Sequence, residues 1–262
     1  MKVSLLNYSP YDKRTVVAAA KGCYSSLSSI DIDNKDYSEY EATKFLRGLI
    51  SSGHDSVLEH AYYTFSIEGI SRACSHQLVR HRIASYSQQS QRYVKFANAK
   101  HPEDFFVIPP EIEKNRTLRS GFLDVTVLAY NAYFDLVEAL EDSGRTTEQA
   151  QEDARYVLPN AAKTNITVTM NIRELRHFFN QRMCKRSQWE IRELAFNMYR
   201  LVFAYSPELL WNSGANCMFG SCKEGKHTCG DPYPQSSGIL FEESKSKVTE
   251  TYGKALEELG KE

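Results

Sequence analysis

The sequence lacks a long hydrophobic run, a signal-like N-terminus and a net charge of either sign. Its 262 residues contain 32 Lys and Arg against 33 Asp and Glu, which gives a formal net charge of −1. This balance excludes a general electrostatic attraction to nucleic acid or to acidic membranes, so any basic site must be local. No run of about 18 apolar residues is present to form a transmembrane helix. We therefore expect a soluble, cytoplasmic protein that binds neither nucleic acid nor membranes.

Cysteine is scarce and irregularly spaced. The six cysteines in this long chain, without an export signal, are expected to be free thiols rather than a disulfide framework. Four residues of the metal-binding types, Cys217, Cys222, His227 and Cys229, form the pattern C-x4-C-x4-H-x-C. They lack the C-x2-C spacing of strong zinc motifs. A structural metal ion stays an open alternative there, and we assign no metal to the functional site.

Internal repeats and low-complexity linkers are absent before Ser213. Helical and strand patterns alternate irregularly, unlike the regular alternation of a doubly wound sheet. This favours an α+β fold with mixed helices around a short, mostly antiparallel sheet. We predict a main domain over residues 1–212 and an irregular, Cys-containing extension over residues 213–262. The extension ends in a charged segment that is either a contact helix or a frayed tail, with the apolar stripe Val248, Tyr252, Leu256 and Leu259.

Local patterns predict the individual elements. Alternating polarity predicts strands over 61–68 and 166–170, and shorter strands are expected at 2–6 and 105–108. Capping signals predict helices that begin at Ser38, Asn171 and Ser187. Further helices are expected over 15–20, over 71–79 and from Thr147 to Arg155. One long helix is expected to face the core with the stripe Phe122, Val125, Ala129, Ala132, Leu136 and Leu140.

The stretch from Arg80 to Tyr93 contains no Asp or Glu. Four cationic or titratable side chains, Arg80, His81, Arg82 and Arg92, lie within its 14 residues among hydroxyl and amide groups. Solvated surface segments usually mix charges of both signs. Arginine, serine and glutamine together can bind a phosphate and the polar edges of a nucleotide. The stretch therefore predicts an anion site, which we expect on an ordered loop after the preceding helix.

The pattern Arg-His-Arg, seven residues and Ser, formed by Arg80, His81, Arg82 and Ser90, resembles the signature of the flavin-dependent thymidylate synthases, the thymidylate synthase complementing protein family. The resemblance covers roughly residues 54–211. It implies reductive methylation of dUMP to dTMP, with methylenetetrahydrofolate as carbon donor and tetrahydrofolate as product. It further implies FAD as the tightly bound cofactor, NADPH as the reductant, and a homotetramer whose active sites lie between subunits.

The resemblance also implies which residues bind dUMP. Arg80, Arg92 and Arg155 would neutralise the phosphate, and Arg182 would stabilise negative charge on the pyrimidine ring. Arg182 and Ser90 are the catalytic candidates. Since no His or Asp beside Ser90 in the sequence identifies an activating base, we favour positioning over a nucleophilic role for its hydroxyl. The full set implied for dUMP is Gln77, Arg80, Gln88, Gln89, Ser90, Gln91, Arg92, Arg155 and Arg182.

A second set of residues is implied for FAD, which would carry the hydride chemistry. Arg173 and Arg182 are nine positions apart, about half a turn of helix, so we expect them to face different ligand regions. His177 follows Arg173 by four positions and shares its face. The full set implied for FAD is His54, Ser56, Glu59, Arg80, His81, Arg82, Gln88, Asn171, Arg173 and His177.

One departure and two alternatives bear on this hypothesis. Gln88 stands where the family commonly has Glu; it can bind a nucleotide but cannot act as a base. The classical thymidylate synthase reaction needs a cysteine in a Pro-Cys-His context, which none of the six cysteines has. A nucleic-acid module would use aromatics such as Tyr86 and Tyr93 together with a basic surplus, and the net charge argues against that surplus.

Overall fold

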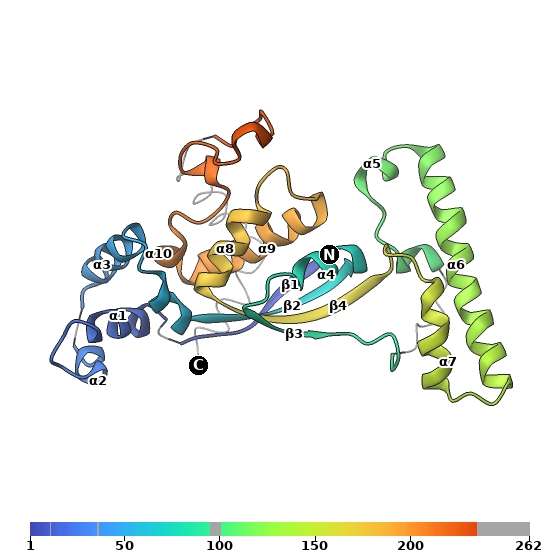
Figure 1. Cartoon of the computed structure of the whole chain (residues 1–262), viewed down its shortest axis with the longest axis horizontal. Coiled ribbons are helices and arrows are strands. Elements are labelled where there is room, and N and C mark those ends of the chain that lie inside the picture. Colours follow the sequence, from blue (N-terminus) through green and yellow to red (C-terminus); the bar gives the residue numbers. More distant parts are fainter. Residues whose placement is uncertain (11, 36, 95–100, 235–262) are drawn as a thin grey trace. The chain divides into compact units, whose positions relative to one another are not determined.

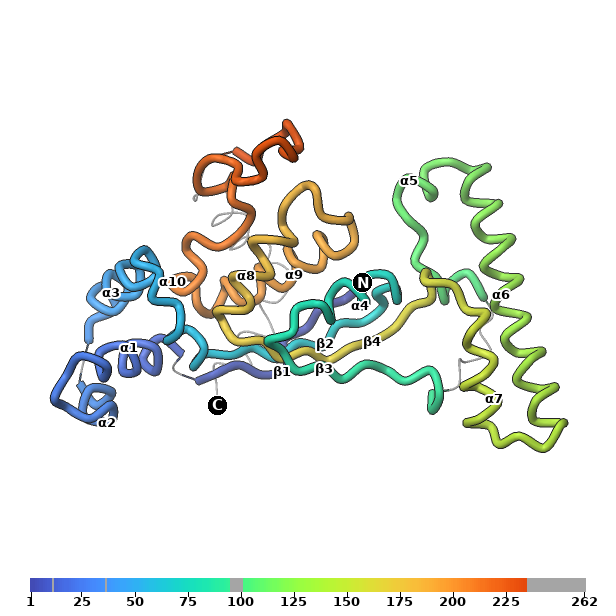
Figure 2. The backbone as a smooth tube through the Cα atoms, viewed as in Figure 1, coloured from blue at the N-terminus to red at the C-terminus, as the bar shows by residue number. Residues whose placement is uncertain are grey.

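The computed structural model describes residues 1–10, 12–35, 37–94 and 101–234, which form helices and one four-stranded sheet (Figures 1 and 2). The sheet has the strand order β1-β2-β4-β3, with β1 at Lys2–Tyr8, β2 at Tyr62–Ser71, β3 at Ala84–Gln88 and β4 at Lys163–Asn171. This mixture of helices and a small sheet confirms the α+β prediction.

Hydrogen bonds and ion pairs fix the strand directions. Lys2 Nζ lies 3.7 Å from Glu68 Oε1, and the Ser9 amide donates to the Tyr62 carbonyl at 3.0 Å, so β1 and β2 are antiparallel. The Thr64 and Thr169 hydroxyls lie 2.9 Å apart, and the Gly69 amide donates to Asn165 Oδ1 at 3.0 Å. Strands β2 and β4 are therefore antiparallel as well.

The chain divides into two compact units, and all four strands pass from one to the other. Unit 1 comprises Met1–Lys2, Ile67–Arg80 and Tyr86–Thr167, and unit 2 comprises Val3–Ser66, His81–Ser85 and the residues from Val168 onward. The signature stretch is consequently shared between the units. Part of it is strand β3 rather than the loop that the polar sequence predicts. The side chains of Ala84–Gln88 are alternately half-buried and exposed, as in a strand with one covered face.

Unit 2 contains helices α1 (Asp12–Gly22), α2 (Ser29–Asp33), α3 (Glu39–Ser51), α8 (Ile172–Arg182), α9 (Trp189–Tyr205) and α10 (Pro207–Leu210), with a 3-10 turn at Asp55–His60. The predicted capping box of Ser38 and Glu41 is confirmed, and so is the Asn171 cap of α8. The predicted cap at Ser187 is wrong. Gln188 caps α9 instead, because its side-chain oxygen accepts from the amides of Glu190 and Ile191, at 3.0 and 3.1 Å.

Unit 1 contains α4 (Arg72–Leu78), α5 (Pro110–Glu113), α6 (Arg116–Asp142) and α7 (Thr147–Ala154), with 3-10 turns at Pro102–Phe105 and Arg155–Val157. Helix α7 begins at Thr147, as predicted, and Thr146 caps it. The strand predicted at residues 105–108 is wrong, since only Phe106 pairs with a neighbour, in a single bridge to Ala162. The adjoining Pro109 and Pro110 lack the amide that a ladder would need.

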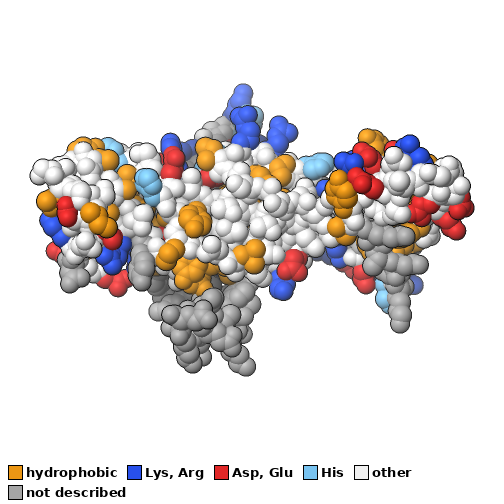
Figure 3. All heavy atoms as spheres, turned by 90° about the horizontal axis from the view of Figure 1, so that it is seen from below, with side chains coloured by type: hydrophobic (Ala, Val, Ile, Leu, Met, Phe, Trp, Pro, Cys, Tyr) orange, Lys and Arg blue, Asp and Glu red, His pale blue; other side chains and the backbone are white. Residues whose placement is uncertain are grey.

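The face that helix α6 buries overlaps the predicted stripe only at its edge, where Phe122 and Leu140 pack against the core. Its buried residues are Thr126, Tyr130, Tyr133 and Val137. Val125 of the predicted stripe is 66% exposed, and Leu118 and Leu128 on the same face are 54% and 68% exposed. The helix is apolar on two faces, so periodicity alone cannot select the core-facing one. Hydrophobic side chains also reach the surface elsewhere, as the face seen in Figure 3 shows.

Residues 213–234 contain 3-10 turns at Asn216–Met218 and Gly225–His227. The predicted terminal helix, with Val248, Tyr252, Leu256 and Leu259, lies outside the described residues. Among the residues that the structure describes, no helix is long and apolar enough to cross a membrane.

Candidate active site

A buried hydrogen-bonded chain in unit 2 links the signature histidine to helix α8. His81 is 5% exposed. Its Nε2 lies 3.0 Å from Arg182 Nε, and its Nδ1 lies 3.2 Å from Glu174 Oε1. A guanidinium nitrogen can only donate, so His81 Nε2 must be the acceptor. The proton of the neutral ring is therefore on Nδ1, from which it is donated to Glu174.

The electrostatics of this chain keep the imidazole neutral. Burial, followed by the positive charge of Arg182 and then by His177, lowers the pKa of His81 to about 4. Burial also raises the pKa of Glu174, against an opposing effect of His177. At neutral pH the histidine thus acts as a fixed, uncharged acceptor that orients the guanidinium of Arg182.

His81, Glu174 and His177 also form a possible set of metal ligands, with ligand atoms within 4.8 Å of one another. The guanidinium at His81 disfavours a cation at this position. The four donors of the C-terminal extension, all of them in the described part of the chain, do not form such a group. Cys217 is buried, whereas Cys222 and Cys229 are exposed.

A polar cavity of about 670 Å³ lies in unit 2, with Glu174 of the hydrogen-bonded set in its wall. Arg173, at its wall, forms an ion pair with Glu59, which raises the pKa of the arginine. Asn171 and His177 also line the cavity. His54 and Ser56 are exposed at the 3-10 turn that carries Glu59. The remaining polar side chains at the cavity are Asp55, Glu174, Arg176, Asn180, Asn212, Ser213, Asn216 and Lys223.

Several of these cavity residues have no counterpart in the sequence-based prediction. Arg176 donates to the Leu209 carbonyl at 2.8 Å and to Asn212 Oδ1 at 2.6 Å. Asn180 donates to the Gly214 carbonyl at 3.1 Å and to Asn216 Oδ1 at 2.8 Å. These bonds attach the segment after α10 to helix α8. Glu174 fits the sequence signal of a capping residue, and only the structure shows that its carboxylate is directed to His81.

The rest of the signature lies in unit 1, beside a second cavity of about 380 Å³ that contains Arg72, Gln89, Ser90 and Gln91 in its wall. The Gln89 amide donates to the Asn165 carbonyl at 2.9 Å, and Arg72 Nη2 donates to the Gln89 carbonyl at 3.0 Å. Arg72 Nε is buried without a hydrogen-bond partner in the structure. Arg72 is a residue that the sequence analysis missed, although it lies on the helix that leads into the signature.

The side chain of Gln88 is engaged within unit 1. Its Nε2 donates to the Ser75 hydroxyl at 2.9 Å and lies 3.3 Å from the Thr164 hydroxyl. Gln77, at the end of α4, is half-buried, and Arg80 is exposed. Gln88 therefore holds β3 in place through the same amide that was predicted to bind a ligand.

Arginines and carboxylates meet at helix α7. Arg92 Nη2 lies 2.9 Å from Glu148 and 3.2 Å from Glu152. Arg155 Nε donates to the backbone carbonyl of Glu152 at 3.2 Å. Burial, and then the charge of Arg155, lower the pKa of Arg72. Unit 1 thus contains Arg72, Arg92 and Arg155. The charge of Arg92 is already compensated by Glu148 and Glu152.

The predicted residues fall into both units. Those of unit 1 are Gln77, Arg80, Gln88, Gln89, Ser90, Gln91, Arg92 and Arg155, and those of unit 2 are His54, Ser56, Glu59, His81, Arg82, Asn171, Arg173, His177 and Arg182. Arg173 pairs with Glu59, whereas Arg182 contacts His81. The ligand roles assigned to these residues stay predictions.

Residues 4–208 match the family model of the thymidylate synthase complementing protein. The chain belongs to this family, that of the flavin-dependent thymidylate synthases. A flavin-dependent thymidylate synthase of Geobacter sulfurreducens is 50% identical over 230 residues, which cover 88% of this chain and 94% of the relative. One of Clostridium tetani is 46% identical over 238 residues, covering 88% and 93%. The chain is accordingly an enzyme of this family.

Two solved structures share the fold. The UMP/dUMP methylase PolB of Streptomyces cacaoi, bound with 5-Br dUMP, has a TM-score of 0.65 at 23% identity and covers 81% of this chain and 95% of its own. The flavin-dependent thymidylate synthase ThyX of Helicobacter pylori, complexed with FAD and dUMP, has a TM-score of 0.63 at 24% identity, covering 82% and 100%.

Proposed function

We propose that this enzyme methylates dUMP to dTMP with methylenetetrahydrofolate as carbon donor, FAD as bound cofactor and NADPH as reductant. The observation that carries the proposal is the chain from Arg182 through His81 to Glu174. It ties the signature histidine to the arginine that the family resemblance assigns to the pyrimidine. A guanidinium held in a fixed orientation in a partly buried site can stabilise negative charge that develops on the ring.

The donor set of the larger polar cavity fits FAD. Arg173, Arg176 and Lys223 provide positive charge, and asparagine side chains provide amide groups, both suited to a polar cofactor that carries a diphosphate. Asn171, Arg173 and His177 would hold the cofactor there, and it would supply the hydride chemistry when bound. His54, Ser56, Glu59 and Arg82 belong to the same proposed set.

For the nucleotide phosphate we propose Ser90, Arg92 and Arg155, with Gln89 and Gln91 beside them. Support comes from the cavity at Ser90 and from the arginines gathered in unit 1. A phosphate that binds Arg92 has to compete with Glu148 and Glu152. Since Gln88 cannot act as a base and its amide is already bonded, we assign it a positioning role and no proton transfer.

We further propose a homotetramer with active sites between subunits, in the cytoplasm, with the catalytic domain over residues 1–212. The exposed apolar face of α6, with Leu118, Val125 and Leu128, supports the assembly, because such a face is normally covered by a partner. Sedimentation of the wild type should give a tetramer, and Leu128→Glu should dissociate it. An active monomer would contradict this part of the proposal.

The proposed function is tested by the purified protein itself. It should be yellow, release FAD on denaturation, and form dTMP from dUMP only when methylenetetrahydrofolate and a reductant are both supplied. A colourless protein that cannot be reconstituted with FAD, or dTMP formation without any folate, would contradict the proposal.

A further inference from the structure

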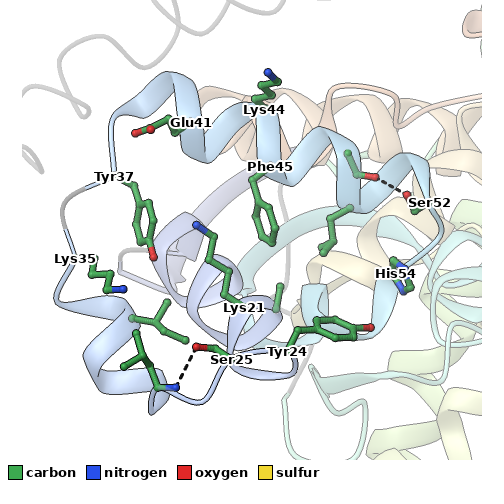
Figure 4. Close-up of a pocket in the computed structure, with 15 residues that line it drawn as sticks. Lys21, Tyr24, Ser25, Lys35, Tyr37, Glu41, Lys44, Phe45, Ser52 and His54 are labelled. Carbon is green, nitrogen blue, oxygen red and sulfur yellow. Dashed lines mark hydrogen bonds between the residues drawn. The ribbon is translucent and has the colours of Figure 1, made fainter.

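A large cavity of about 890 Å³ in unit 2 is unused by the site described above. It is formed by α1, α2 and α3 and by the segments that join them (Figure 4). His54 and Tyr24 lie at one end, Lys35 and Tyr37 lie at the other, and Lys21 lies between them. Apart from His54, none of these residues belongs to the predicted site.

Cations and aromatic rings dominate the wall. The ammonium of Lys21 lies 3.8 Å from the ring centre of Tyr37 and 5.1 Å from that of Phe45, so two cation–π contacts hold it in the cavity. The one acidic side chain among the lining residues, Glu41, is bonded to the amide and hydroxyl of Ser38 at 3.0 and 2.7 Å. Those bonds lower its pKa. The wall therefore favours an anionic ligand with an aromatic ring.

The positions of the lysines in the cavity wall favour a ligand with separate carboxylates over a ligand with phosphates. Phosphates are commonly bound at open helix N-termini. Here the N-termini of α2 and α3 are both closed by capping boxes, whose acidic members are Asp31 and Glu41. Lys21 and Lys35 instead stand apart as single point charges at different places along the cavity. A chain of spaced carboxylates can meet them one after another.

The cavity ends next to the polar cavity proposed for FAD. His54 lines the first, and the following residue, Asp55, lines the second together with Arg173 and His177. A ligand in the α1–α3 cavity can thus reach the proposed flavin position at the His54 end. Its distal part would then extend past Lys21 toward Lys35.

We infer that the α1–α3 cavity binds the aminobenzoyl-oligoglutamate part of the folate co-substrate, an inference that rests on the proposed function. The aminobenzoyl ring packs beside Tyr24 near the His54 end, and the glutamate carboxylates pair with Lys21 and Lys35. The enzyme consequently prefers folates with several glutamates over the monoglutamate.

The test compares two lengths of the same co-substrate on the holoenzyme. The wild type should have a lower KM for methylenetetrahydrofolate triglutamate than for the monoglutamate. Lys21→Gln combined with Lys35→Gln should reduce this preference about fivefold to tenfold, which corresponds to two exposed ion pairs. The matched control is Lys114→Gln, which removes a lysine from an exposed pair in unit 1 and should keep the preference. Lys35→Gln alone, at an exposed position, is the variant safest for folding.

Equilibrium binding provides an arm that does not depend on turnover. Pteroyltriglutamate should bind the wild type more tightly than folic acid does, and the double variant should lose the difference. A wild type without preference, or a preference that survives in the double variant, would overturn the inference. So would a raised KM for NADPH with the folate preference unchanged, since the cavity would then serve the reductant. If the wild type binds the triglutamate but forms no dTMP with either folate, the proposed function is refuted, while the assignment of the cavity to the folate tail stands.

Discussion

The two clusters of signature residues use positive charge in opposite ways. In unit 2, Arg182 bonds to a neutral histidine that is 5% exposed. In unit 1, Arg92 lies between Glu148 and Glu152, and its side chain is 38% exposed. One partner of Arg182 is thus a neutral, positioned histidine, whereas two carboxylates compensate the charge of Arg92.

The contrast separates charge stabilisation from binding. A neutral acceptor orients a guanidinium without compensating its charge, and electrostatic interactions are stronger in a partly buried site than in water. A guanidinium paired with two partly exposed carboxylates gives less net attraction, since a phosphate must replace partners that are already present. We therefore assign the chemical step to the cluster of unit 2 and substrate affinity to that of unit 1.

The largest effect is expected from Arg182→Ala. Loss of a preorganised charge stabiliser costs about 3 kcal/mol, roughly a hundredfold in rate. Formation of dTMP should fall by that factor, while FAD stays bound and reducible by NADPH. Lysine should restore little, because it lacks the planar pair of donors. Arg200→Ala on α9 is the control, and Arg173→Ala should instead lose FAD first. Equal flavin loss in the Arg173 and Arg182 variants would show that the two roles are wrongly assigned.

The buried histidine should give a pH-dependent stability. Because the pKa of His81 is about 4 in the folded protein and about 6.5 in an unfolded chain, the unfolded chain binds the extra proton between these values. The free energy of unfolding should therefore decrease as the pH falls, by about 2 kcal/mol from this residue between pH 7 and pH 5. Denaturant titrations of the wild type and His81→Gln at both pH values isolate the contribution. If the wild type and His81→Gln differ in free energy of unfolding by the same amount at pH 7 and at pH 5, a neutral His81 is contradicted.

Arg92→Ala should mainly affect substrate affinity. One charge-assisted contact to the phosphate would be lost, and we expect KM for dUMP to rise about tenfold with a smaller change in kcat. Arg119→Ala, which breaks an exposed pair with Glu113, is the control. A fall in kcat at unchanged KM would move Arg92 from binding to the chemical step.

The smallest effect is expected from Glu148→Gln, and it has the opposite sign. Removing one carboxylate from Arg92 reduces the competition with phosphate, so KM for dUMP should fall by about threefold. The effect should weaken as salt is added. If KM rises instead, Glu148 orients Arg92 for the substrate rather than competing with it.

Sequence patterns predicted the features that depend on neighbouring residues. The Ser38 capping box, the Asn171 cap and the two main strands are of this kind. Features that depend on tertiary contacts were missed. Helix α6 has two apolar faces, and only packing selects Tyr130 and Tyr133 for the core.

The same limit applies to the site. The signature and family resemblance singled out His81 and Arg182, but Glu174 lies 93 positions from His81 in the sequence. Its position three residues after Asn171 fits a helix cap, so the local pattern had a complete explanation without a functional role. Arg72 was missed for a similar reason, because its contact is to the backbone of Gln89.

Arg182 and Glu174 together should hold His81 as the tautomer with its proton on Nδ1, leaving Nε2 to accept from Arg182. Nitrogen-15 NMR of protein labelled at histidine, with the His81 signals assigned by His81→Gln, reads this directly. At pH 7 we expect a protonated Nδ1 and an unprotonated Nε2 in the wild type, because Arg182 can only donate to Nε2 and Glu174 accepts from Nδ1. A proton on Nε2 in the wild type, or a doubly protonated ring, would show that His81 is not a neutral acceptor for Arg182.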